Sequence, residues 1–88
     1  TAPQALTLMN GNLTQENSKH LAARVMKAAK DTTSRIKQLY WFALSREPTH
    51  VELNFCMNYV LSKQTKPKEA WQELALVMFN TNEFIYLD

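Results

Sequence analysis

The sequence predicts an all-α protein, a compact bundle of four to five helices joined by short loops. Apolar residues recur at helical spacing along most of the 88 residues, and 45% of all residues are hydrophobic, which is enough for a core. One glycine and three prolines leave little turn chemistry for a sheet protein. The length fits one domain, so we expect residues 1–88 to form a single helical domain.

The first two helices are predicted for residues 3–10 and from Asn12 to about Lys30. Pro3 suits the first turn of a helix, and Gly11 suits a stop between the two. On a wheel with about 100° per residue, the longer helix is amphipathic. Its apolar face contains Leu21, Ala22, Val25, Ala28 and Ala29. Its opposite face contains Lys19, Arg24, Lys27 and Lys30.

A third helix is predicted over residues 32–45, with Asp31 or Thr32 at its start. Its main apolar stripe contains Ile36, Leu39, Tyr40, Ala43 and Leu44. Trp41 and Phe42 lie off this stripe. A helix that is apolar nearly all round is either central in the fold or carries an interface.

The fourth helix is predicted from a capping box and reaches about Lys63. In Thr49-His-Val-Glu52 the Thr49 hydroxyl can accept from the Glu52 amide, and the Glu52 carboxylate can accept from the Thr49 amide. The helix has two apolar faces, so we expect it to be packed between neighbours. One face contains Leu53, Cys56, Met57, Val60 and Leu61, and the other contains Val51, Phe55 and Tyr59.

The fifth helix is predicted to begin at Pro67 and to end within residues 80–82, because asparagine favours the geometry of helix ends. Its inner face contains Trp71, Leu74, Ala75, Met78 and Phe79. Large apolar residues resume after it, although chain termini usually fray unless something holds them. We therefore expect Phe84, Ile85 and Tyr86 to hold the terminus against the core.

Charge and cysteine content argue against several classes of function. The net charge of +2 is small. Residues 19–37 are basic and residues 47–88 are acidic, which favours contacts within the chain over a nucleic-acid surface. No segment resembles a signal peptide or a membrane-spanning run. The single cysteine, Cys56, excludes an internal disulfide framework.

No catalytic, cofactor-binding or metal-binding residue is predicted. His20 and His50 have no Cys or His partners at ligand spacing. His50 and Cys56 are six positions apart, about 240° around a helix, so they do not form a nucleophile and base pair. Cys56 lies in an apolar arc, so we expect it to be a small core residue.

Three segments of the sequence carry a family resemblance. They are residues 4–10 (QALTLMN), residues 39–53 (LYWFALSREPTHVEL) and residues 74–88 (LALVMFNTNEFIYLD). Together they resemble the C-terminal end of an uncharacterised domain in very large secreted planctomycete proteins, which often carry cytochrome-c-like modules upstream. The family pattern is similar to QALxLLN, then LxxxALxRxPTxxEL, then LxxALLNSNEFLYxD. The conservative departures from it are Met9, Met78, Phe79 and Thr81.

The resemblance implies that this chain is an excised C-terminal piece of a longer polypeptide. It also implies an extracytoplasmic location, either periplasmic or secreted. It transfers no catalytic residue to this chain. Any haem would belong to other modules, because the sequence contains no Cys-x-x-Cys-His attachment motif.

We expect a noncatalytic helical module that packs against upstream modules of its own polypeptide or against a protein partner, including a second copy. The candidate interaction surface is Trp41, Phe42, Phe84 and Tyr86. Neither a nucleic acid nor a membrane span is expected. Three alternatives stay open: the terminal part of a hydrolase-like or redox enzyme with catalytic groups upstream, a carbohydrate or cell-surface module that uses Trp71, and helix-turn-helix DNA binding.

Overall fold

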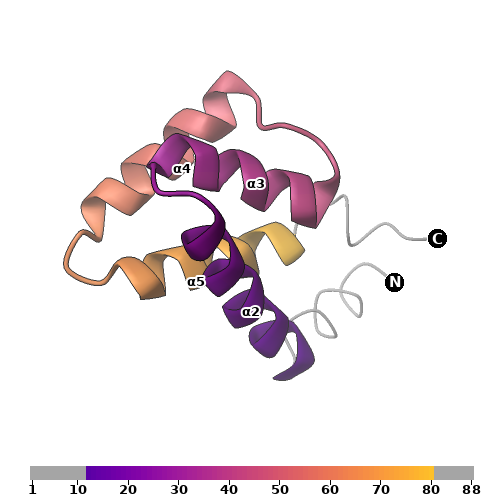
Figure 1. Cartoon of the computed structure of the whole chain (residues 1–88). Coiled ribbons are helices and arrows are strands. Elements are labelled where there is room, and N and C mark those ends of the chain that lie inside the picture. The colour runs from indigo at the N-terminus through magenta and orange to yellow at the C-terminus, as the bar shows by residue number, and fades with distance from the viewer. Residues whose placement is uncertain (1–11, 81–88) are drawn as a thin grey trace.

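The computed structural model describes residues 12–80, which form an all-α bundle of four helices (Figure 1). The helices are α2 (Asn12–Ala28), α3 (Thr32–Leu44), α4 (His50–Ser62) and α5 (Pro67–Phe79). The predicted all-α bundle is therefore confirmed. The helix expected for residues 3–10 and the apolar stretch after residue 80 lie outside the described residues.

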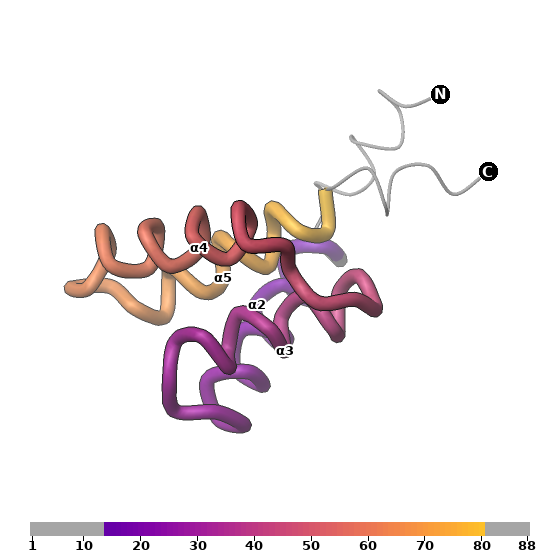
Figure 2. The backbone as a smooth tube through the Cα atoms, turned by 90° about the horizontal axis from the view of Figure 1, so that it is seen from above, coloured from indigo at the N-terminus to yellow at the C-terminus, as the bar shows by residue number. Residues whose placement is uncertain are grey.

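The helices are arranged with α4 and α5 along one side of the molecule and α2 and α3 along the other (Figure 2). The most extensive packing is between α2 and α5. In Figure 1, α3 and α5 run in the same direction, and α4 and α5 spread apart with increasing distance from the loop that connects them. Within residues 12–80, no helix is both long enough and apolar enough to span a bilayer.

Local side-chain contacts explain where α3 and α4 begin. The Asp31 carboxylate accepts a hydrogen bond from the Ser34 amide at 2.9 Å and caps α3, which decides between the two predicted start residues. The Thr49 hydroxyl accepts from the Glu52 amide at 3.2 Å, and the Glu52 carboxylate accepts from the Thr49 amide at 2.8 Å. This confirms the capping box at the start of α4.

The core lies where the predicted inner faces meet. Trp71 of α5 is 1% exposed and packs with Ile36 and Leu39 of α3, which are fully buried. The other buried members of this cluster are Leu21, Ala22, Val25, Tyr40, Ala43, Cys56, Leu74, Ala75 and Met78. Arg35 closes the α2–α3 turn by donating to the carbonyl oxygens of Ala29 and Met26, at 2.7 and 3.0 Å.

Two expectations about the helices were wrong in detail. Helix α2 ends at Ala28 instead of about Lys30, and Ala28 itself is exposed, because Asp31 caps the next helix and requires a turn before it. Helix α4 contacts both α3 and α5, as expected, but its second apolar face is only partly covered. Tyr59 of that face packs against the core, while Val51 and Phe55 are exposed.

Candidate interaction surfaces

The first candidate surface is an open groove of about 720 Å³ between α2 and α3, called here the aromatic groove. Two aromatic side chains of α3 line it: Trp41 is 59% exposed and Phe42 is 42% exposed. They are exposed because Ile36, Leu39, Tyr40 and Ala43 occupy the side of α3 that faces the core. The prediction that Trp41 and Phe42 lie off the core stripe is confirmed.

Cations border the aromatic groove. The guanidinium carbon of Arg24 lies 4.1 Å from the centre of the Phe42 ring, a cation–π contact that contributes about 0.5–1 kcal/mol at exposed sites. Lys37 also lines the groove, and Glu47 is its one acidic residue. Gln38 contributes a buried side-chain oxygen, Oε1, which has no hydrogen-bond partner among the described residues. The groove thus combines exposed aromatic area with a net positive charge.

The turn between α3 and α4 is held by a two-bond ion pair. The Arg46 guanidinium donates from Nη1 and Nη2 to the two Glu52 carboxylate oxygens, at 2.8 and 2.9 Å. These bonds, with help from the Thr49 amide, lower the pKa of Glu52 from 4.5 to about 2. This pair is not among the contacts predicted from the sequence. An Arg and a Glu on either side of a Pro-Thr turn were the available signal.

The second candidate surface is the exposed side of α4, called here the α4 face. Val51 is 78% exposed, Phe55 61% and Leu61 55%. The exposed residues of α4 are His50, Val51, Asn54, Phe55, Asn58, Leu61 and Ser62. None of them is Asp, Glu, Lys or Arg. The α4 face therefore offers apolar area and amide groups, and it offers no Lys or Arg to the DNA alternative.

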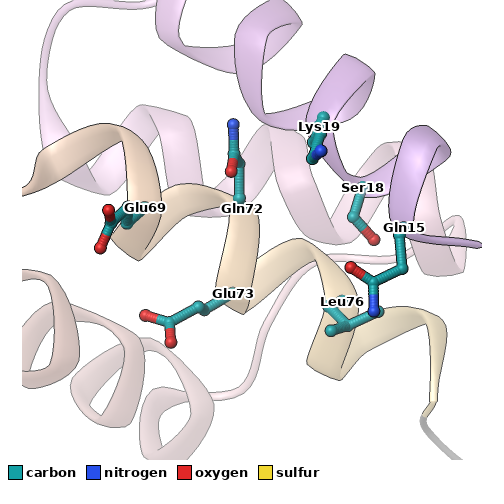
Figure 3. A pocket seen from close by; sticks show the side chains of 7 residues that line it. All are labelled: Gln15, Ser18, Lys19, Glu69, Gln72, Glu73 and Leu76. Carbon is teal, nitrogen blue, oxygen red and sulfur yellow. The ribbon is translucent and has the colours of Figure 1, made fainter. Parts of the chain in front are cut away.

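A smaller crevice of about 220 Å³ lies between α2 and α5 (Figure 3). Its lining is mostly polar: Gln15, Ser18, Lys19, Glu69, Gln72, Glu73 and Leu76. Figure 3 shows the Glu69 and Glu73 carboxylates turned away from α2. Glu73 accepts hydrogen bonds from Tyr59 of α4 at 2.6 Å and from Lys63, which follows α4, at 3.0 Å. The crevice contains no aromatic platform and no converging acid and base.

Cys56 is a core residue, as predicted. It is 2% exposed, and its Sγ lies 3.9 Å from the Tyr40 hydroxyl. Burial raises the pKa of the Cys56 thiol, and burial together with the thiol raises the pKa of Tyr40. A buried thiol with a raised pKa is a poor nucleophile. Among residues 12–80, no group of three His, Cys, Asp or Glu is placed to hold a metal ion.

Two of the four predicted surface residues can be located. Trp41 and Phe42 lie together in the aromatic groove, whereas Phe84 and Tyr86 lie outside the described residues. Trp71 is buried in the core, so it is not available as the sugar platform of the carbohydrate alternative. Trp41 is the exposed tryptophan.

Fold and surfaces together define a helical module with exposed apolar contact areas and, in its described part, no assembled catalytic group. Residues 1–60 match the family PSD1, described as "Protein of unknown function (DUF1553)". The match covers more than half of the 88 residues, so the chain belongs to this family. It includes the first two resemblance segments and stops before residues 74–88. Comparisons with curated proteins and with solved structures find no match.

Proposed function

We propose that this chain is a noncatalytic packing module that attaches to the rest of a longer polypeptide through the α4 face. The observation that carries this proposal is the lack of charged residues among the exposed positions of α4, next to three large exposed apolar side chains. Surfaces that stay in water normally carry both signs of charge. An uncharged helix face with Val51, Phe55 and Leu61 is typical of an interface core.

The other helices provide the contrast that supports this assignment. The exposed positions of α2 include Glu16, Lys19, Arg24 and Lys27, and those of α5 include Lys68, Glu69 and Glu73. The exposed faces of α2 and α5 therefore carry charged residues of both signs. The α4 face departs from that pattern over its whole length, which favours permanent cover by another part of the protein.

The wider setting that we propose rests on the family resemblance. The chain would be the C-terminal piece of a large planctomycete protein that is exported from the cytoplasm. Cytochrome-c-like modules upstream in the same polypeptide would bind any haem. The membership in a family of unknown function is compatible with this setting.

A labelling experiment tests the attachment. Phe55→Cys places an accessible thiol on the α4 face, and the native Cys56 is buried and provides a low background. We expect fast maleimide labelling in the 88-residue chain. In the longer natural polypeptide we expect labelling at least about tenfold slower, because the thiol then reacts only after local opening.

Glu69→Cys is the matched control, since Glu69 is exposed on α5 and remote from the α4 face in sequence. It should label equally fast in both proteins. Equal rates for Phe55→Cys in the two proteins would refute the proposal. Analytical ultracentrifugation of the 88-residue chain tests whether the partner is a second copy. A dimer that Phe55→Cys disrupts would assign the α4 face to self-association instead.

A further inference from the structure

We propose that residues 81–88 of the same chain dock in the aromatic groove. In this arrangement Phe84 and Tyr86 cover Trp41 and Phe42, and the acidic residues of the segment face the cations of the groove. The proposal concerns a different surface from the α4 face, so it stands or falls independently of the proposed function.

The chemistry of the segment matches the chemistry of the groove. Residues 84–87 are Phe-Ile-Tyr-Leu, flanked by Glu83 and Asp88. The groove presents two exposed aromatic rings beside Arg24 and Lys37. Apolar area and two negative charges therefore meet apolar area and two positive charges, which outweigh the single negative charge of Glu47 at the groove.

The segment begins on the correct side of the molecule. Helix α5 ends at Phe79, and Trp41 and Phe42 lie in the last turn of α3, which ends at Leu44. Both views place the ends of α3 and α5 on the same side (Figures 1 and 2). Eight extended residues span at most about 26–29 Å. Because the ends of α3 and α5 lie on the same side, a segment of this length that starts at the end of α5 is long enough to lie over the last turn of α3.

Charge decides between the two candidate surfaces for this segment. On the α4 face the carboxylates of Glu83 and Asp88 would meet no Lys or Arg among the exposed residues. In the groove they meet Arg24 and Lys37. The uneven charge distribution of the chain, basic in residues 19–37 and acidic at the C-terminal end, is accounted for by this contact.

Acrylamide quenching of tryptophan fluorescence in the full chain tests the docking. Trp71 is buried, so the quenchable emission reports on Trp41. We expect Trp41 to be shielded in the unmodified chain. The double variant Glu83→Lys/Asp88→Lys should raise the quenching constant about threefold, as the cover over the indole is lost. Adding Arg24→Glu/Lys37→Glu to it should restore the shielding, because both charges of each pair are then reversed.

The control replaces the second pair of changes with Lys27→Glu/Lys68→Glu, which reverses two exposed lysines that do not line the groove. This combination should not restore shielding. Free quenching of Trp41 in the unmodified chain would overturn the proposal, and so would failure of the Arg24/Lys37 swap to restore it. Shielding that disappears on dilution would place the segment of a second copy in the groove and would overturn docking within one chain.

Discussion

The aromatic groove and the α4 face both expose large apolar side chains, yet they differ in charge. In the groove Trp41 and Phe42 are bordered by Arg24 and Lys37. On the α4 face Val51, Phe55 and Leu61 have only His, Asn and Ser among their exposed neighbours on the helix. The positive charges beside the groove favour an acidic occupant, and they keep the groove hydrated when no occupant is bound. A face without charges gains mainly from permanent burial, so the two surfaces call for different occupants.

The largest expected effect is on stability, and it distinguishes a tryptophan of the core from the tryptophan of the aromatic groove. Trp71→Ala should lower the free energy of unfolding by about 3–5 kcal/mol, because it removes a buried indole and leaves a cavity. Trp41→Ala should cost less, about 1–2 kcal/mol, because the four helices leave Trp41 mostly exposed and only the docked segment would cover it. Urea unfolding followed by circular dichroism measures both values.

If Trp71→Ala does not fold, Trp71→Phe provides a milder comparison, with a loss of about 1–2 kcal/mol. The comparison between core and groove breaks down if Trp41→Ala is as destabilising as is expected for Trp71→Ala. Trp41 would then belong to the folding core, and the aromatic groove would not be a docking surface.

A smaller effect is expected at the ion pair between the two surfaces. Arg46 and Glu52 join the end of α3 to the start of α4, and their side chains are 35% and 32% exposed. Glu52→Gln removes the charge and should lower the free energy of unfolding by about 1–2 kcal/mol at pH 7, which is reduced from the value for buried charged hydrogen bonds by solvent screening. Denaturant titrations of both proteins measure the difference.

The difference should also depend on pH. The Glu52 pKa is lowered from 4.5 to about 2 in the folded protein, so the unfolded state binds the proton more readily. The contribution of Glu52 is therefore complete above pH 4.5 and is lost as the pH falls toward 2. The Glu52→Gln variant should converge with the unmodified chain over that interval. A difference that stays constant from pH 7 to pH 2 would show that the Glu52 charge is not what holds the turn.

The sequence predicts the helices well because their signals are local. The capping residues Asp31 and Thr49 and the proline at position 67 mark starts, and apolar spacing identifies the buried faces. The aromatic groove is less predictable. The spacing places Trp41 and Phe42 off the core, but the approach of Arg24 to the Phe42 ring depends on how α2 packs against α3. Local patterns do not encode that packing.

The α4 face also shows what local sequence patterns cannot predict. Two apolar faces on one helix predict two packing partners, and α4 contacts both α3 and α5. These contacts cover the Cys56 side and Tyr59 but leave Val51 and Phe55 exposed. The exposed side chains of Val51 and Phe55 are the part of the pattern that residues 12–80 leave unexplained, and the proposed attachment rests on them. The predicted surface residues Phe84 and Tyr86 stay a prediction, because they lie outside the described residues.

The smallest expected effect is at Phe55, one residue away from the core. Phe55→Asn should change the free energy of unfolding of the 88-residue chain by no more than about 0.5 kcal/mol, because Phe55 is exposed and its helix neighbours already include Asn54 and Asn58. Cys56→Asn is the matched control: it buries an amide whose one polar neighbour is the Tyr40 hydroxyl, and it should cost about 2 kcal/mol or more. A Phe55→Asn loss as large as the Cys56→Asn loss would mean that the α4 face is already covered within this chain. A negligible loss, measured by the same urea titration, keeps that face available for another part of the polypeptide.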